Sequence, residues 1–272
     1  MAEHRRDQAA LKRIRPAGVT PLELWDFRLD GRPLQFWLSH VTFPLKLAGM
    51  VAALRENPPM EWPSATRARM RSVSHVHLAG GGANRPALVS ALGAQRLNAT
   101  VAGDPVFGSA RAGQRLLKGT QVLCADVGQT SVKLARGDWT WRVERDLVQA
   151  PRIDDVWPAG RSEARDSTIG FLTRAIATGA DTADALVLAL PCEVTDDGAC
   201  LACSYCWEAP DAGLLDELVL GLGFRPDAVG VLNDAELAAV AAAGDDRVPR
   251  GETILVLTVG HGVGAALLDP RE

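Results

Sequence analysis

Two carboxylates and three glycine-rich turns have the residue types that phosphate chemistry requires. The most informative stretch is Asp126-Val-Gly128-Gln129-Thr130-Ser-Val-Lys133, in which an aspartate precedes a glycine-containing turn with a hydroxyl. Because glycine has no side chain to block approach, backbone N–H groups of such a turn can face phosphate oxygens. Asp126 can hold Mg²⁺ through water, since hard cations favour oxygen ligands. A plain hairpin turn has the same composition, so both interpretations stay open.

Two further turns suggest close approach of the backbone to a ligand. Residues 258–264 place three glycines between two apolar strands, although a simple glycine-rich hairpin looks similar. Residues 79–84 form a strand-to-helix junction, and the start of a helix favours anionic or polar groups. The candidate ligand-binding residues are Gly260, His261, Gly262 and Gly264 in one turn and Gly80, Gly81, Gly82 and Ala83 in the other.

The second carboxylate is Asp234, in the sequence Val231-Leu-Asn233-Asp234. It follows an apolar strand and opens a predicted helix. An aspartate at this point can be the N-terminal cap of the helix. It can also be a general base that accepts the proton of a substrate hydroxyl.

Short alternating elements from residue 120 onward position these carboxylates. Three runs separated by turn signals predict an antiparallel meander, and helices alternating with apolar strands follow it. The predicted strands are 122–127, 131–135, 139–147, 185–190 and 228–232; the helices are 167–179, 212–222 and 234–243; 151–161 is a loop. A meander followed by right-handed crossovers onto the same sheet predicts a ribonuclease H-like half.

A second meander begins at the end of the sequence, where strands over 253–259 and 263–268 flank a tight turn. Two strands cannot bury a face alone, so this hairpin needs partners from elsewhere in the chain. The first third of the chain supplies candidates: strands over 23–29, 33–38, 73–78 and 99–102, and helices over 44–56, 84–92 and 106–117. We therefore expect the tail hairpin to join N-terminal strands in one sheet.

Composition narrows the class of protein. Of the 272 residues 47% are hydrophobic and 23% charged, with a net charge of −4. This composition is ordinary for a globular protein. A small negative net charge gives no overall electrostatic attraction to nucleic acid or to an anionic membrane. No stretch reaches the ~18 apolar residues of a membrane-spanning helix, and residues 1–8 lack the apolar run of a secretory signal. We expect a cytoplasmic protein with reduced cysteines and a small-molecule partner, with a homodimer left open.

The turns together resemble the motifs of a known superfamily. Residues 126–133 resemble the first phosphate motif of the actin and hexokinase superfamily, 260–264 its second phosphate motif, and 80–83 its adenosine motif. Within that superfamily, residues 190–193, 198–207 and 231–235 are similar to the ROK (repressor, open reading frame, kinase) sugar kinases. The ROK likeness covers residues 121–268 and the superfamily likeness 73–117, whereas residues 1–70 match no family.

The resemblance implies an α/β fold of two ribonuclease H-like lobes, each a mixed five-stranded sheet flanked by helices, around an interlobe cleft. The family's motif order is first phosphate, catalytic aspartate, second phosphate, adenosine; here adenosine comes first and the second phosphate motif last. Joining the N- and C-termini of the usual family chain at a point that corresponds to residues 118–120 reproduces this order. We therefore expect a circular permutation. The alternative is that the chain is a piece of a fused or tandem gene product. Residues 1–119 plus 251–272 would form the second lobe and 120–250 the first.

The function that the resemblance implies is transfer of the γ-phosphoryl group of ATP, with Mg²⁺, to a hydroxyl of a sugar or sugar-like compound. Asp126 would organise the metal and Asp234 would be the catalytic base. Gly128, Gln129, Thr130 and Lys133, with the other two turns, would bind the nucleotide, and Asn233, Glu193 and Trp207 the acceptor.

The chain departs from this family in ways that keep other functions open. His261 stands where the second phosphate loop usually has threonine, which favours a non-catalytic nucleotide-binding sensor or scaffold as an alternative. Cys200, Cys203 and Cys206 recur at every third position near Cys192. They are either buried inert thiols or metal ligands, the latter as in an ATPase activator with a metal cluster between subunits.

Overall fold

The computed structural model divides the chain into two compact units. The first unit comprises the chain up to Arg15 and Ala110–Leu237, and the second comprises Pro16–Ser109 and Ala238–Glu272. The structure describes residues 11–22, 24, 28–29, 32–33, 40–83, 85–119, 121–196, 198–201, 205, 211–224, 226–260 and 262–269.

A six-stranded mixed sheet forms the centre of the first unit, with the strand order β1-β11-β10-β7-β8-β9. The strands are β1 (Leu11–Arg13), β7 (Val122–Val127), β8 (Ser131–Arg136), β9 (Trp139–Glu144), β10 (Ala185–Leu190) and β11 (Ala228–Asn233). β7, β8 and β9 form the antiparallel meander, and β10 and β11 add in parallel. The predicted meander and crossover strands are therefore confirmed.

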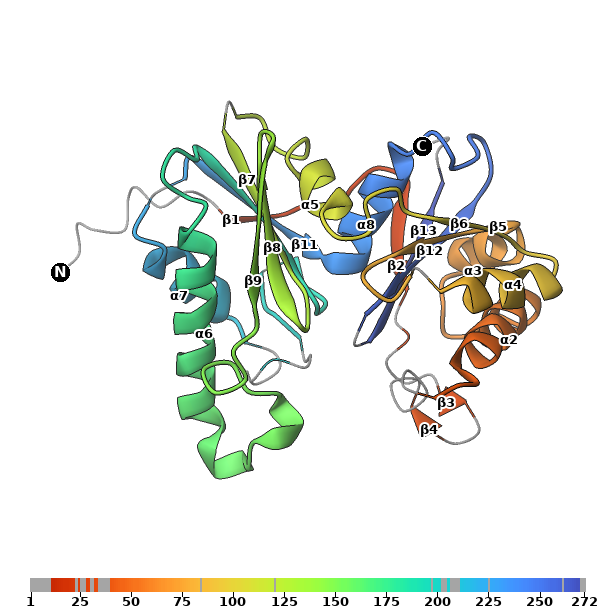
Figure 1. The fold of residues 1–272 in the computed structure, drawn as a ribbon, viewed down its shortest axis with the longest axis horizontal. Helices are drawn as coiled ribbons and strands as arrows, with labels where there is room; N and C mark the ends of the chain where they lie inside the picture. The colour runs from red at the N-terminus through yellow and green to blue at the C-terminus, as the bar shows by residue number, and fades with distance from the viewer. Residues whose placement is uncertain are drawn as a thin grey trace. The chain divides into compact units, whose positions relative to one another are not determined.

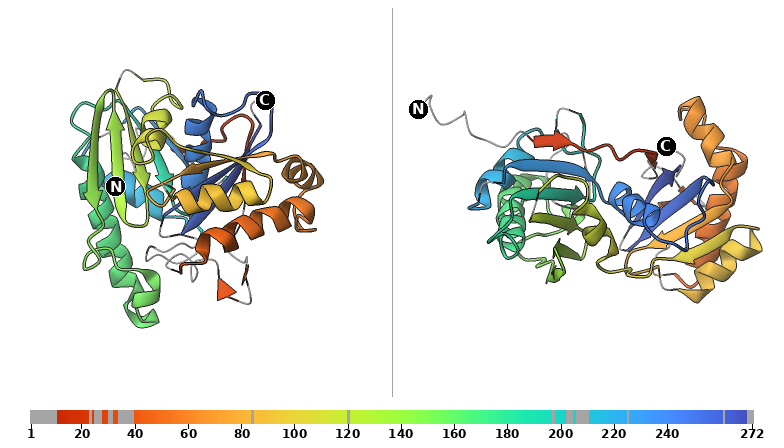
Figure 2. Two further views of the ribbon diagram at one scale, coloured as in Figure 1. Left: turned by 45° about the vertical axis from the view of Figure 1, so that its right-hand side comes forward. Right: turned by 90° about the horizontal axis from the view of Figure 1, so that it is seen from above.

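The expected five-strand count for this sheet is wrong, because β1 adds a sixth strand. β1 pairs in parallel with β11, with Lys12 opposite Gly230, and the right-hand view in Figure 2 shows it lying along that strand. Its sequence, Leu-Lys-Arg, is too short and polar to be recognised as a strand on its own. This segment is a strand because it pairs with the free backbone groups of β11 at the sheet edge, and not because its residues have a high β propensity.

Alternating side chains give this sheet two buried faces. Leu123, Ala125 and Val127 of β7 pack in a core cluster with α6 (Arg161–Ala177) and α7 (Leu214–Gly221). Val122 and Cys124 point to the other face, where Ala110 of α5 (Gly108–Gly113) and Leu237 of α8 (Asp234–Ala243) cover them. β10 is buried at every residue, as expected of a central parallel strand. Two short 3₁₀ turns, η1 (Ile153–Asp155) and η2 (Pro158–Gly160), lead into α6.

The second unit contains a five-stranded mixed sheet with the order β2-β13-β12-β5-β6. Its strands are β2 (Val19–Leu22), β5 (His75–Ala79), β6 (Asn98–Val101), β12 (Ile254–Val259) and β13 (Val263–Leu268). The tail hairpin β12–β13 pairs with β5 on one side and β2 on the other, so the predicted union of tail and N-terminal strands is confirmed.

The N-terminal partner of the tail is not the one expected. β2 pairs antiparallel with β13. Of the predicted strands 23–29 and 33–38, the described parts β3 (Arg28–Leu29) and β4 (Arg32–Pro33) form a separate ladder, and residues 23, 25–27 and 34–38 lie outside the described residues. Pro21 obscures the strand pattern of β2 in the sequence. A proline lacks the N–H group, and an edge strand such as β2 tolerates this loss.

Three helices cover one face of this second sheet, as Figure 1 shows. They are α2 (Phe43–Glu56), α3 (Ser64–Arg71) and α4 (Pro86–Ala94). Phe43 and Leu47 of α2, Met70 of α3 and Leu88 of α4 are buried against Val76 and Leu78 of β5. None of the described helices is both long and apolar enough to cross a membrane.

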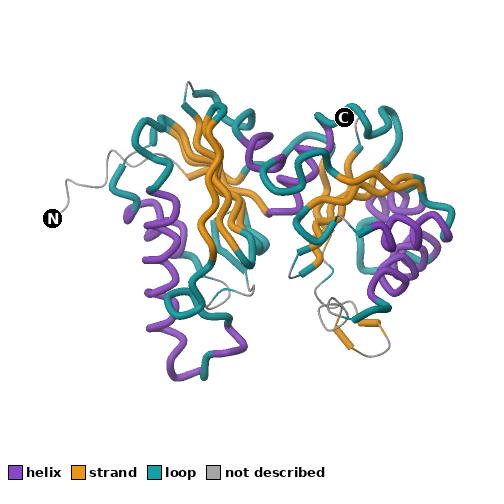
Figure 3. The backbone as a smooth tube through the Cα atoms, in the orientation of Figure 1, coloured by secondary structure: helices purple, strands orange, loops and turns teal. Residues whose placement is uncertain are grey.

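Apart from β1, the strands of the six-stranded sheet correspond to those of the five-stranded sheet; strands are drawn in orange in Figure 3. In the order β9-β8-β7-β10-β11 the first three strands are antiparallel and the last two are added in parallel. The order β2-β13-β12-β5-β6 has the same directions. The difference lies in connectivity, because β9 follows β8 directly whereas β2 comes from the beginning of the chain.

The division of the chain differs in detail from the expected boundaries. β1 and residues 110–119 belong to the first unit, and residues 238–250 belong to the second. The reasons are the pairing of β1 with β11 and the packing of Ala110 against the core around Cys124.

Candidate functional site

Three charged side chains gather at one edge of the six-stranded sheet. Parallel strands end at the same edge, and Asp126 of β7 lies level with Ala189 of β10, which lies level with Leu232 of β11. Lys133 is opposite Asp126 across the β7–β8 ladder. Asp234 follows β11 directly and is the first residue of α8. The topology thus brings together the predicted metal ligand and the predicted base.

The charges of these groups depend on one another. Lys133 Nζ lies 3.0 Å from Asp126 Oδ2, and both side chains are largely buried. Burial lowers the pKa of Lys133, but the charge of Asp126 and their hydrogen bond outweigh this and raise it overall. Burial and the charge of Asp126 raise the pKa of Asp234 from 3.8 to about 7, against the opposing effect of Lys133. Asp234 is therefore ready to exchange a proton near neutral pH.

The raised pKa predicts how stability changes with pH. The folded state holds the proton of Asp234 more tightly than the unfolded state. The contribution of this proton to the free energy of unfolding is therefore fully present below pH 3.8 and is lost as pH rises to about 7. Above that pH this contribution lowers the free energy of unfolding by on the order of 1–3 kcal/mol. Asp234→Asn should remove this loss, making the variant more stable than wild type at pH 8 but not at pH 4. Urea denaturation of both proteins across this range tests it, and curves that stay parallel would contradict the prediction.

The β7–β8 turn lies beside this cluster. Gly128 donates its N–H to Ser131 O at 3.0 Å, which closes the turn around Gln129 and Thr130. A Cβ at position 128 would lie 3.2 Å from Ser131 O and 3.3 Å from Lys133 Nζ. A larger residue would therefore disturb the Lys133–Asp126 pair, which gives the glycine of the predicted phosphate motif a physical reason.

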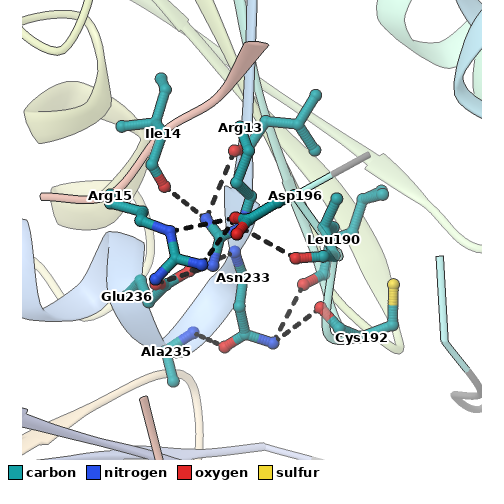
Figure 4. A network of polar contacts seen from close by, with 11 residues as sticks. Arg13, Ile14, Arg15, Leu190, Cys192, Asp196, Asn233, Ala235 and Glu236 are labelled. Atoms are coloured by element: carbon teal, nitrogen blue, oxygen red, sulfur yellow. Dashed lines mark hydrogen bonds and ion pairs between the residues drawn. The ribbon is translucent and has the colours of Figure 1, made fainter. Parts of the chain in front are cut away.

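A capping box fixes the start of α8. Asn233 Oδ1 accepts the N–H of Ala235 at 2.8 Å, and Glu236 Oε2 accepts the N–H of Asn233 at 2.9 Å. The side-chain cap is thus Asn233, and Asp234 lies one position inside the helix. Asn233 Nδ2 donates to Cys192 O at 2.9 Å, as Figure 4 shows. These contacts orient the helix start, while a contact of Asn233 with an acceptor stays a prediction.

Arg13 of β1 extends this network. Its Nη2 lies 2.8 and 2.6 Å from the two oxygens of Glu236 (Figure 4). Its Nε donates to Val194 O at 2.9 Å. The two side chains are 9% and 2% exposed, so the pair is buried. Strand β1 therefore neutralises the carboxylate that caps the helix carrying Asp234.

In the second unit, the predicted adenosine turn lies against the start of the predicted second phosphate turn. Gly82 donates its N–H to Val259 O at 2.7 Å, and Ala83 donates to Gly80 O at 3.0 Å. Gly260 donates to Gly262 O at 2.9 Å, and Gly264 donates to Thr258 Oγ1 at 3.1 Å. Two motifs that are far apart in sequence thus meet at the end of β12. Ala83 is itself fully buried, so its side chain belongs to the core.

Gly80 and Gly81 form a matched pair for testing this turn. Gly80 has a φ of +86°, and a Cβ there would lie 2.7 Å from Val259 O, whereas a Cβ at Gly81 meets nothing within 4 Å. Gly80→Ala should lower the free energy of unfolding by about 2–4 kcal/mol, through the left-handed backbone and the clash. Gly81→Ala should change it by at most about 0.5 kcal/mol. Denaturant titrations of both variants test this, and equal losses would show that the turn is packed differently.

Some of the remaining predicted site residues lie outside the residues that the structure describes. Glu193 is exposed after β10, and its carbonyl accepts the N–H of Leu201 at 2.9 Å. Trp207 and His261, like Cys203 and Cys206, lie outside the described residues. Cys192 and Cys200 are buried thiols. Among the described residues, no group of three or more His, Cys, Asp or Glu side chains is arranged to hold a metal ion.

Four residues of the first unit were not predicted: Arg13, Glu236, Arg145 and Tyr205. Of these, only Glu236 has a sequence signal, because Asn233 and Glu236 have the spacing of a capping box. Arg13 contacts the capping box, and Arg145 and Tyr205 contact the carbonyl groups of the β7–β8 turn.

The chain is similar over part of its length to a solved structure. That structure is the inorganic polyphosphate/ATP-glucomannokinase from Arthrobacter sp. strain KM, similar over 56% of this chain with 22% sequence identity and a TM-score of 0.39. The similarity spans 59% of that enzyme's chain. No protein-family model matches the sequence, and no curated protein matches it.

Proposed function

We propose that the chain transfers the γ-phosphoryl group of ATP to a hydroxyl of a small molecule, a sugar or sugar-like compound. The observation that carries the proposal is the cluster of Asp126, Lys133 and Asp234 beside a glycine turn at one sheet edge. Phosphoryl transfer needs little covalent chemistry from a protein. It needs positioned charges, a turn that accepts phosphate oxygens and a base for the attacking hydroxyl.

Asp234 is the group suited to the role of base. Its pKa of about 7 allows it to be ionised at neutral pH while still accepting a proton readily. The capping box and Arg13 hold the backbone on both sides of Asp234. Such a residue would orient an acceptor hydroxyl and take its proton as the hydroxyl oxygen attacks phosphorus.

The donor set fits Mg²⁺ and the phosphates of ATP. Mg²⁺ is usually held by one or two carboxylates, with water and substrate phosphates completing its shell, and Asp126 would supply one. When bound, the metal would neutralise phosphate charge. Lys133 would orient Asp126 through their hydrogen bond, and the turn formed by Gly128, Gln129 and Thr130 would receive phosphate oxygens. We further propose that Gly80–Gly82 and the turn after β12 contribute to nucleotide binding.

The strand correspondence supports the proposed circular permutation. In the first unit the third meander strand, β9, follows β8 in sequence, but in the second unit its counterpart β2 precedes the other four strands of its sheet. A permuted gene accounts for this order, because permutation keeps the strands of a sheet but changes their order along the chain.

The direct test measures ADP formation from MgATP with a panel of hexoses and other polyhydroxyl compounds, alongside calorimetric binding of MgATP. Nucleotide binding with acceptor-dependent ADP formation is the expected result. If MgATP does not bind, the proposed function is wrong. If it binds but no acceptor increases ADP formation, the chain is a nucleotide-binding protein without this activity.

A further inference from the structure

The carbonyl groups of the β7–β8 turn are held by Arg145, which directly follows β9, and by Tyr205, which is 77 positions from Gly128. Tyr205 Oη donates to Gly128 O at 2.7 Å. Arg145 Nη1 donates to Gln129 O at 3.1 Å, and the Arg145 backbone N–H donates to Thr130 O at 2.9 Å. Three consecutive carbonyl oxygens are therefore bound on one side of the turn.

Arg145 and Tyr205 also bind each other. The guanidinium of Arg145 lies 3.8 Å from the centre of the Tyr205 ring, and the two residues are 8% and 0% exposed. A cation over an aromatic face is most favourable when it is shielded from water, as here. Arg145 additionally donates to Ala150 O and Pro151 O, each at 2.7 Å. The pair is thus rigidly held, and we call it the Arg145–Tyr205 clamp.

Holding the carbonyls determines the direction of the N–H groups. In a trans peptide the C=O of one residue points opposite to the N–H of the next. With the carbonyls of Gly128 and Gln129 bound to the clamp, the N–H groups of Gln129 and Thr130 point away from it. Within the part of the chain that the structure describes, no hydrogen bond engages these two N–H groups, and Thr130 is exposed. Successive outward N–H groups form a concavity suited to an anion.

We propose that the Arg145–Tyr205 clamp is a positioning device for phosphate at this turn. This inference rests on the proposed function, since it concerns the same phosphate site. Tyr205 lies in sequence between Cys200 and Asp211, which exchange two backbone hydrogen bonds of 3.0 and 2.9 Å. Because the Tyr205 hydroxyl donates to Gly128 O, phosphate bound at the turn would change the surroundings of that hydroxyl.

Removal of the Tyr205 hydroxyl tests the clamp. Tyr205→Phe keeps the ring under Arg145 but leaves Gly128 O without its donor, so the affinity for MgATP and for inorganic triphosphate should fall about tenfold. The affinity for AMP, which lacks the β- and γ-phosphates, should stay unchanged. Arg145→Lys should act in the same direction, because lysine lacks the guanidinium that reaches several carbonyls at once.

A matched control separates positioning from a general loss of stability. Thr168 is fully buried in α6, and its hydroxyl donates to Ala164 O at 2.7 Å. Thr168→Val also removes one buried hydroxyl from the first unit, but it lies outside the turn and the clamp. It should lower stability to a similar extent as Tyr205→Phe and leave the affinity for triphosphate unchanged.

A second measurement needs no variant. Tyr205 is the only tyrosine in the 272 residues, so incorporation of 3-fluorotyrosine places a single ¹⁹F nucleus at the clamp. Its NMR signal should shift when MgATP or triphosphate is added and stay in place with AMP.

The outcomes distinguish the clamp from the function on which it rests. If wild type binds neither MgATP nor triphosphate, the proposed phosphate site is wrong and the clamp inference falls with it. If wild type binds both, but Tyr205→Phe binds them equally well and the ¹⁹F signal does not move, only the clamp is refuted. A loss of affinity shared equally by triphosphate and AMP also refutes it, because that pattern indicates general damage.

Discussion

Replacing Asp234 with asparagine is expected to lower acceptor-dependent turnover by about 10²–10⁴-fold, the usual contribution of a general base. Asparagine has the same shape but cannot take up the proton of an attacking hydroxyl. Because the N–H of Ala235 and the N–H of Asn233 are capped by Asn233 and Glu236, the start of α8 should survive the change. The affinity for MgATP should therefore stay within about threefold of wild type.

The measurement is steady-state ADP formation together with calorimetric MgATP binding. Asp216→Asn is the matched control, because Asp216 is also an acidic residue in the first turn of a helix of the first unit, but it is exposed. Its turnover should match wild type. Unchanged turnover in Asp234→Asn would show that another group accepts the proton. Equal losses of turnover and nucleotide affinity would show that the residue acts in binding.

The fold could be predicted wherever each element has its own signal. β7, β10 and β13 are apolar or alternating runs between turn residues, and they lie where those patterns place them. β1 and β2 lack such a signal, because Leu11–Arg13 is short and polar and β2 contains Pro21. Both are strands because a sheet edge with unpaired backbone groups lies beside them, and this information is not in their own residues.

Some contacts of the candidate site could also be predicted from the sequence, whereas others could not. Asp126 and Asp234 could be predicted to meet, since both follow or end parallel strands of one sheet. The Lys133–Asp126 pair depends on the register of the β7–β8 hairpin, which places the two residues directly opposite each other. Arg145 and Tyr205 are 60 positions apart, and Arg13 and Glu236 are 223 apart. Contacts over such distances arise only from tertiary packing, so local patterns do not reveal them.

Replacing Arg13 with methionine is expected to lower the free energy of unfolding by about 3–5 kcal/mol, since this leaves a buried carboxylate without its cation. Glu236 is 2% exposed, and Arg13 binds both of its oxygens. Arg15 provides the matched control two positions further along the chain. Its pair with Asp196 has the same shortest distance, 2.6 Å, but both side chains are 72% exposed. Arg15→Met should therefore lower the free energy of unfolding much less than Arg13→Met, because a solvent-exposed ion pair contributes little to stability.

The double variant Arg13→Met with Glu236→Gln shows whether the loss comes from the unpaired charge. Glutamine is neutral but keeps a side-chain oxygen that can accept the N–H of Asn233, so the capping box is retained. Most of the stability lost in Arg13→Met should then return, since no uncompensated charge remains buried. Urea denaturation of the wild type, both single variants and the double variant gives the coupling free energy between the two positions. A coupling near zero would mean that β1 does not bring Arg13 to Glu236, and the sixth strand of the first sheet would then be wrong.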